Sequence, residues 1–156
     1  MISVDIANHR FQLRAAAVVV HDGFVLLHRL EGYKFWALPG GRVEPGEDAR
    51  SALEREMLEE LNEDVECAEL LYVVENFFEH AAKPNHEIGL YFRAQLSPVS
   101  TLLDKSRTHA GVEDGKRLEF RWFLIKQLHD VDLRPSFLGT SLSKPTLDFQ
   151  HMVQRG

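Results

Sequence analysis

The sequence predicts an α/β fold in which helices pack on a mixed sheet. Short segments rich in β-branched and aromatic residues lie before and after one strongly helical segment, and a weaker helical pattern follows near the C-terminus. The chain has 156 residues, of which 44% are hydrophobic and 27% are charged. That length suffices to bury a core, and that composition is typical of ordered globular proteins. We therefore expect a single domain over residues 1–156.

The first part of the chain is expected to form a hairpin followed by a loop. Residues 14–20 are apolar and predict a buried strand, residues 21–23 (His-Asp-Gly) predict a tight turn, and residues 24–30 predict the second strand. A third apolar stretch then runs into a loop at the Pro-Gly-Gly of residues 39–41. A further turn is expected at the Pro-Gly of residues 45–46.

The strongest helix signal covers residues 49–61. This segment contains neither Gly nor Pro, and Asp48 directly before it is a favourable N-cap residue. The helix is expected to end at Asn62, because asparagine tolerates the left-handed conformation with which many helices end.

A second hairpin is expected after the helix. Residues 69–79 and 86–96 are rich in β-branched and aromatic residues, which favours strands. Between them lies a segment that contains Pro84 and Asn85, so we expect the connecting loop there.

The last third of the chain gives weaker signals. Residues 101–116 are polar and contain glycine, so a loop is expected, whereas residues 118–125 alternate like a strand. Residues 126–131 predict a short helix or turn, and residues 146–155 favour a final helix.

Acidic residues are concentrated in one segment. The net charge is −6, but residues 44–64 alone contain nine acidic and two basic residues, a charge of −7. The rest of the chain therefore carries a charge of +1. A local cluster of this kind favours a cation site. The sequence shows no basic patch of the kind that binds duplex nucleic acid.

Several other classes of protein are not indicated. The longest apolar run, residues 15–20, is far too short to cross a bilayer, and the first residues do not resemble a secretory signal. The single cysteine, Cys67, cannot form an internal disulfide, and no zinc-binding pattern surrounds it. We expect a cytoplasmic protein that does not bind membranes.

Three carboxylates of the predicted helix, Glu56, Glu59 and Glu60, border its apolar stripe on a helical wheel. Glu60 follows Glu56 by four residues and Glu63 follows Glu59 by four, so we expect no helical salt bridge to relieve the repulsion. One interpretation is a solvated acidic face. The other is a site for a hard divalent cation, Mg²⁺ above all, because carboxylates beside a core are costly unless paired or metal-bound.

Residues 41–63 resemble the Nudix box, whose pattern is G-x5-E-x7-R-E-U-x-E-E-x-G-U, with U an apolar residue. The lead-in at residues 36–40, Trp-Ala-Leu-Pro-Gly, is also similar to that of the family, and the resemblance extends more loosely over residues 14–128. The residues at matching box positions are Gly41, Glu47, Arg55, Glu56, Met57, Glu59 and Glu60.

The resemblance has two departures, both at the exit of the helix. Asn62 stands where the box has glycine, and it can adopt the same left-handed turn. Glu63 stands where the box has an apolar residue, and we expect Val65 to supply the missing apolar contact.

The resemblance implies the Nudix α/β/α sandwich, with the box helix packed on one face of a mixed sheet. It implies a MutT-like pyrophosphatase that hydrolyses a nucleoside diphosphate linked to another group, a small-molecule substrate. Glu56, Glu59, Glu60 and the carbonyl of Gly41 would bind Mg²⁺, or Mn²⁺ in its place. The catalytic set would be Glu59, Arg55 and Glu47; an Arg55–Glu47 pair would hold the preceding loop and orient Glu56, or would be a purely structural salt bridge.

Residues outside the box are candidates for two further roles. Glu113, Glu119 and Glu87 are each either an additional general base or an ordinary solvated residue. Arg29 and Arg14 either face the phosphates of the substrate or are ordinary strand-end charges.

Three aromatic residues, Trp36, Phe77 and Phe78, could stack on a base or belong to the core. The family resemblance leaves the substrate open between nucleoside triphosphates and nucleotide sugars. The alternative function is a Nudix domain that senses a nucleotide without cleaving it, and a homodimer is compatible with either function.

Overall fold

The computed structural model describes residues 1–156 and contains ten strands, two α-helices and two short 3₁₀ helices. In chain order these elements are β1 (Ser3–Ile6), β2 (His9–Val18), β3 (Val20–His21), β4 (Phe24–Leu30), β5 (Gly40–Arg42), α1 (Ala49–Leu61), β6 (Val65–His80), β7 (Lys83–Leu96), η1 (Thr101–Leu103), β8 (His109–Glu113), β9 (Lys116–Leu124), η2 (Ile125–Asp130), α2 (Leu138–Ser141) and β10 (Gln150–Arg155).

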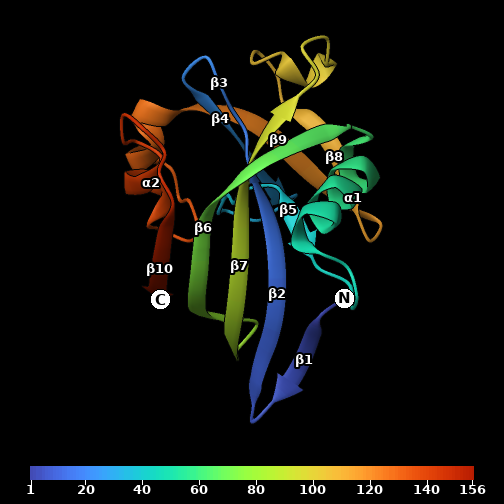
Figure 1. Cartoon of the computed structure of the whole chain (residues 1–156), viewed down its shortest axis with the longest axis vertical. Coiled ribbons are helices and arrows are strands. Elements are labelled where there is room, and N and C mark those ends of the chain that lie inside the picture. The colour runs from blue at the N-terminus through green and yellow to red at the C-terminus, as the bar shows by residue number, and fades with distance from the viewer.

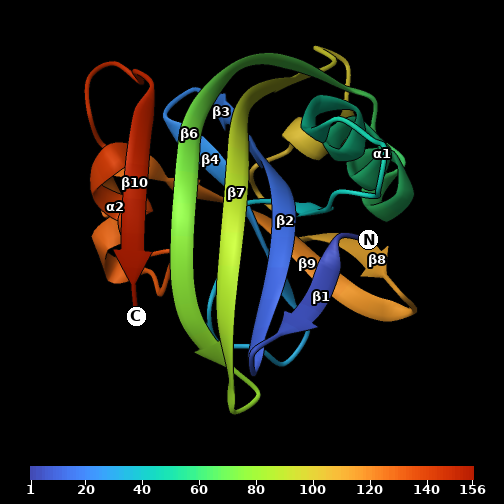
Figure 2. The same cartoon turned by 60° about the horizontal axis from the view of Figure 1, so that its bottom comes forward.

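The strands form two sheets. The larger sheet has the order β1-β2-β7-β6-β10, with β5 also paired to β2, and it is mixed because β2 runs parallel to β7 and β10 runs parallel to β6. The smaller sheet is antiparallel, with the order β3-β4-β9-β8. Helix α1 lies on one side of the sheets, and α2 lies on the other side beside β10 (Figure 1, Figure 2). The expected α/β fold, with a mixed sheet and a helix packed on it, is confirmed.

Two hydrophobic clusters follow this layering. One joins the buried face of α1 to the sheets, and its largest members include Leu53, Met57, Phe120 and Trp122. The other joins the opposite faces of the strands to α2 and η2, and its members include Tyr72, Leu128, Leu138 and Leu142. None of the helices is both long enough and apolar enough to span a bilayer.

Helix α1 has the predicted bounds and the predicted caps. The Asp48 carboxylate accepts a hydrogen bond from the backbone N–H of Ser51 at 2.9 Å, which satisfies one of the free donors at the helix start. Asn62 ends the helix in the left-handed region, with φ 56° and ψ 36°. Val65, 7% exposed, packs into the cluster under α1, where an apolar residue was expected.

The first predicted hairpin is only partly correct. Only Val20 and His21 of β3 pair with β4, across a turn at Asp22 and Gly23 with φ of 52° and 80°. Strand β2 belongs to the other sheet, where it pairs with β7. The alanines and valines of β2 alternate between the two hydrophobic clusters. A strand that is buried on both faces has a continuous apolar sequence. Such a sequence gives no signal for the residue at which the chain passes from one sheet to the other.

The second predicted hairpin exists, but its turn lies elsewhere. Strands β6 and β7 meet at Ala81 and Ala82, with φ of 53° and 61°, so the loop expected at Pro84 and Asn85 is wrong. Pro84 is tolerated in β7 because the pairing with β2 begins only at Asn85. Alanine rarely adopts positive φ, so the sequence carried no signal for this turn.

Two predictions for the last third of the chain are wrong. The segment expected to be a loop, residues 101–116, contains η1 and β8, and β8 pairs with β9 across an Asp114-Gly115 turn with φ of 48° and 76°. That dipeptide is a strong signal for a tight hairpin turn. The helix expected at 146–155 is also wrong, because β10 pairs with β6 and alternate residues of β10 face the core. The strand expected at 118–125 is confirmed as β9, and η2 covers most of residues 126–131.

Candidate active site

The loop before α1 is tied to the helix by one ion pair. Arg55 donates to both oxygens of the Glu47 carboxylate, from Nε at 2.8 Å and from Nη2 at 2.9 Å. The loop itself closes in a turn between Glu44 and Glu47, with Gly46 at φ 82°. Two parallel hydrogen bonds to one carboxylate fix both partners, and the guanidinium of Arg55 holds the pKa of Glu47 below its usual range. The expected Glu47–Arg55 pair is therefore present.

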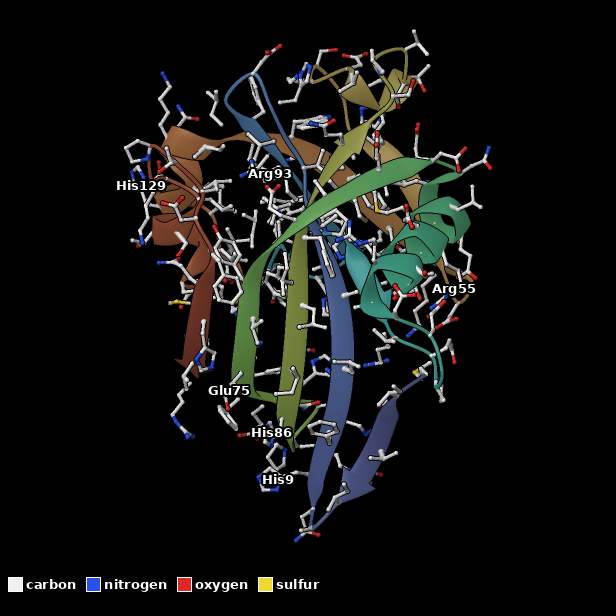
Figure 3. All side chains as sticks on the ribbon, in the orientation of Figure 1. His9, Arg55, Glu75, His86, Arg93 and His129 are labelled. Atoms are coloured by element: carbon white, nitrogen blue, oxygen red, sulfur yellow. The ribbon has the colours of Figure 1, made fainter.

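Arg55 also reaches the acidic face of α1. Its Nη1 donates to Glu56 at 3.0 Å and to Glu59 at 3.2 Å, and the second contact spans four residues of the helix. The expectation that no helical salt bridge relieves the repulsion is wrong, because one arginine serves three carboxylates. Figure 3 shows Arg55 beside α1, near several side-chain oxygen atoms.

Glu60 is the carboxylate that Arg55 does not reach. It is 4% exposed, and neither of its oxygens has a hydrogen-bond partner. Burial, followed by the charges of Glu113 and Glu56, raises the pKa of Glu60 to about 9. Burying a charged carboxylate without partners costs free energy, so the Glu60 carboxylate is expected to bind either a cation or a proton.

Gly41 lies directly against this face. A Cβ atom at position 41 would lie 2.3 Å from Cδ of Glu56, so any other residue there would displace the Glu56 carboxylate. Gly41 pairs with Ala15 of β2, which fixes its place at the edge of the larger sheet. The Glu56 carboxylate therefore lies directly against the backbone of Gly41.

The fit to a divalent cation comes from the two unpartnered oxygens of Glu60, which lie close enough to Glu56 for the charge of Glu56 to raise the pKa of Glu60. No three or more His, Cys, Asp or Glu side chains are placed to hold a metal ion between them, so Glu56, Glu59 and Glu60 do not form such a group. Mg²⁺ takes only one or two carboxylates from a protein and completes its octahedron with water and phosphate oxygens. The donor set on α1 fits such an ion.

The candidate bases outside the box are separated by the fold. Glu113, on β8 beside α1, is close enough for its charge to raise the pKa of both Glu56 and Glu60. Glu119 is paired with Arg29 at 2.8 Å. Glu87, on β7, is 5% exposed and accepts a hydrogen bond from Gln12 at 2.6 Å. Only Glu113 lies with the carboxylates of the box.

The two candidate phosphate ligands also differ. Arg29 stacks on the ring of Trp36, 4.3 Å from its centroid, in addition to its pair with Glu119. Arg14 donates to the carbonyl of Leu38 at 2.7 Å, and its charge is one cause that lowers the pKa of Glu60. Arg14 therefore lies beside the acidic face, while Arg29 is held in other contacts.

His28 is a residue of this region that the sequence did not single out. It is 7% exposed, its Nδ1 has no partner, and its ring lies against Phe120 at 5.3 Å. Burial, with the charge of Arg14 as a second cause, lowers the pKa of His28 to about 3, so the ring is neutral. The signal available in the sequence was a histidine directly after four apolar residues, 24–27, of a predicted strand.

The remaining candidates lie apart from the acidic face. Trp36 is a core residue at 5% exposure, and Phe77, on β6, packs against His86 and Arg155. Figure 3 places His86 far from Arg55, at the opposite end of the larger sheet. Burial raises the pKa of Cys67 to about 11, so its thiol stays protonated.

Comparisons with known proteins agree with this arrangement. The family model of the NUDIX domain matches residues 11–139. A MutT NUDIX hydrolase from Burkholderia pseudomallei is 28% identical with a TM-score of 0.56, and the match covers 74% of this chain and 84% of that one. A NUDIX hydrolase from Nitrosomonas europaea is 22% identical with a TM-score of 0.63, over 93% and 79% of the two chains.

A third similar structure is a UDP-X diphosphatase. It is 20% identical with a TM-score of 0.59, and the match covers 90% of this chain. The chain spans 66% of that protein. At that identity the likeness concerns the fold.

Proposed function

The chain belongs to the NUDIX family of hydrolases, and on that premise we propose that it cleaves the diphosphate bond of a nucleoside diphosphate linked to a further group. The observation that carries the proposal is Glu60, a carboxylate 4% exposed with two unpartnered oxygens in the middle of the acidic face. A merely solvated acidic face would leave this carboxylate in water. A hydrolase that uses a divalent cation explains why it is buried and why nothing in the protein neutralises it.

Mg²⁺ is the proposed cofactor, and Mn²⁺ would find the same oxygen ligands. Glu56, Glu59, Glu60 and the carbonyl of Gly41 would together hold one or more such ions. When bound, such an ion would neutralise charge on the diphosphate and lower the pKa of a water molecule at the site.

The residues of the chain then have separate tasks. Arg55 holds Glu47 with two hydrogen bonds and Glu56 with a third, so the loop and the carboxylate keep one geometry. Arg14 supplies positive charge next to Glu60, where it can bind a phosphate oxygen of the substrate. Positioning and charge neutralisation of this kind account for most of the catalysis of phosphoryl transfer.

One carboxylate must take the proton from the attacking water. Glu59 is the proposed acceptor, because its side chain is 60% exposed and is held by only one hydrogen bond, to Arg55. Glu113 is the second candidate, since it lies beside the box carboxylates. Glu119 is disfavoured, because its carboxylate accepts from Arg29.

The substrate is proposed to be a small nucleotide. One structurally similar protein is a UDP-X diphosphatase, which supports this class without fixing its members. We treat the whole chain as one such catalytic domain.

The test is a screen for phosphate release with purified protein. Nucleoside triphosphates, ADP-ribose, nucleotide sugars and dinucleoside polyphosphates are each incubated with Mg²⁺, with Mn²⁺ and with EDTA. Products of the ion-free and ion-containing reactions are separated by chromatography. Cleavage of at least one compound at a phosphate–phosphate bond, abolished by EDTA, is expected. Tight binding of a nucleotide without turnover would instead identify a sensing domain.

A further inference from the structure

One face of the larger sheet is only half-buried, although its other face is buried throughout. Along β7, His86, Ile88 and Leu90 are half-buried, whereas the residues that alternate with them are buried. Successive side chains of a strand point to opposite faces, so these three residues share one face of the sheet. Figure 2 turns this face to the viewer, with no helix in front of β2, β7 and β6 and with α1 beside one end.

Five residues form a row across this face. In register with one another, strand by strand, they are Val4 of β1, Phe11 of β2, His86 of β7, Phe77 of β6 and Arg155 of β10. The centroid of the His86 ring lies 5.4 Å from that of Phe11 and 4.6 Å from that of Phe77. The guanidinium of Arg155 lies over Phe77, 4.3 Å from its centroid. The rings and the guanidinium therefore form one continuous surface.

A second row makes this surface wider. Its members, again in register, are Leu13 of β2, Ile88 of β7, Glu75 of β6 and Val153 of β10. We call these two rows the open face. Val4 and Val153, at its two edges, are 47% and 54% exposed. Monomeric proteins rarely expose a contiguous apolar surface of this kind, so the open face indicates a binding partner.

The size of the open face fits a protein–protein interface. Five strands spaced about 4.8 Å apart span roughly 24 Å. Successive rows lie about 6.6 Å apart, so the two rows with one flanking row on each side cover roughly 26 Å. The product is a flat area of about 600 Å², and side chains that protrude from it add accessible surface. Stable interfaces bury about 800 Å² of accessible surface on each partner.

The charged groups of the open face already have partners within it. Nε2 of His151 donates to the Glu75 carboxylate at 2.6 Å, and Arg155 is stacked on Phe77. Covering a paired charge costs less free energy than covering an isolated one. Single-stranded nucleic acid also stacks on aromatic residues, but it requires a positively charged groove. The open face has one arginine against one carboxylate, and the net charge of the chain is −6. Its charge therefore favours a protein partner.

We propose that the open face is the interface of a homodimer, in which two copies of this chain pack sheet against sheet about a two-fold axis. A two-fold interface uses the same surface on both copies, so that surface must be self-complementary. The open face meets this condition, because it has an apolar centre and balanced charges. Aromatic residues and arginine are also the residues enriched at protein interfaces. The dimer does not depend on the proposed hydrolysis of a nucleotide.

The test is sedimentation equilibrium of the purified protein between about 1 μM and about 1 mM. Wild type should pass from the monomer to the dimer mass within this range. Val153→Asp introduces one carboxylate from each copy into the apolar interface, and it should raise the dissociation constant of the dimer at least about 100-fold. Val4→Asp, on β1 at the opposite edge of the open face, should raise it as well and leaves β10 unchanged.

Val112→Asp is the matched control. Val112 is 48% exposed on β8, an edge strand of the smaller sheet, and lies outside the open face. This variant should dimerise like wild type, and thermal melts show whether each of the three variants is folded. A wild-type protein that stays monomeric over the whole range would overturn the inference. A dimer that Val112→Asp weakens as much as Val153→Asp would also overturn it, because the interface would then lie elsewhere.

Discussion

The molecule buries a carboxylate in two regions and treats each differently. Glu60, on α1, is 4% exposed with no partner for either oxygen, and its nearest charges include those of other acidic residues. Glu87, on β7 of the larger sheet, is 5% exposed but accepts a hydrogen bond from Gln12. The difference teaches which carboxylate requires a ligand. An unpartnered carboxylate among acids requires a cation, whereas a carboxylate that accepts a hydrogen bond from an amide has a partner within the protein.

The largest expected effect separates the two regions by activity. Glu59→Gln and Glu60→Gln should each lower kcat by orders of magnitude, because each removes a charged ligand or a proton acceptor. Glu87→Gln, which lies outside the acidic face, should lower kcat far less. Steady-state kinetics with one substrate measure all three variants. If Glu60→Gln retained full Mg²⁺-dependent turnover, the acidic face would not be the catalytic region.

A smaller effect tests which arginine binds the phosphates of the substrate. Arg14→Ala should raise KM for a phosphate-bearing substrate by about tenfold, because a charged hydrogen bond to phosphate is lost. Arg29→Ala should change kcat/KM much less, since Arg29 is paired with Glu119 and stacked on Trp36. The same assay compares both variants. A larger loss of kcat/KM for Arg29→Ala than for Arg14→Ala would instead assign the binding of phosphate to Arg29.

The pH dependence of stability in the absence of metal tests whether Glu60 is buried in solution. Burial raises the pKa of Glu60 to about 9 in the folded protein, while the unfolded chain titrates near 4.5. The unfolded state therefore releases this proton first, and the free energy of unfolding should fall as pH rises from about 5 to 9. In EDTA, denaturant titrations of Glu60→Gln should show a shallower fall than wild type. Identical slopes would mean that Glu60 is hydrated in solution.

The smallest effect concerns the end of the helix that carries the acidic face. Asn62 has φ 56°, a conformation that costs most residues about 1–2 kcal/mol. Asn62→Gly should be neutral or stabilising, and Asn62→Val should be destabilising by an amount in that range. Thermal melts of the two variants give the comparison. A valine variant as stable as wild type would contradict the assigned cap.

The acidic region could be predicted from the sequence because its signals are local. Asp48, Asn62 and the three carboxylates lie within one helix, where spacing alone sets the geometry. The Arg55–Glu59 pair is also local, since it spans four residues of the helix, but the spacing of the acidic residues alone predicts unrelieved repulsion.

The second region depends on strand register, which the sequence does not encode locally. Gln12 and Glu87 are 75 residues apart, and they meet only because β2 runs parallel to β7. Strand β10 shows the same limit, since its parallel pairing with β6 decided between strand and helix. Because the turn lies at Ala81 and Ala82, β7 begins earlier than the predicted residue 86. Neither alanine is a residue that predicts a turn.

The most direct test of the account is the Mg²⁺-dependent change in melting temperature of Glu60→Gln beside that of Glu54→Gln. Both changes replace a carboxyl group of α1 by an amide and keep helix propensity, but Glu54 is exposed and Glu60 is buried. Wild type and Glu54→Gln should be stabilised by Mg²⁺, by about 2.7 kcal/mol at a concentration 100 times Kd. Glu60→Gln should lose most of this stabilisation and should melt at or above wild type in EDTA. Equal stabilisation of all three proteins by Mg²⁺ would contradict the assignment of α1 as the cation site.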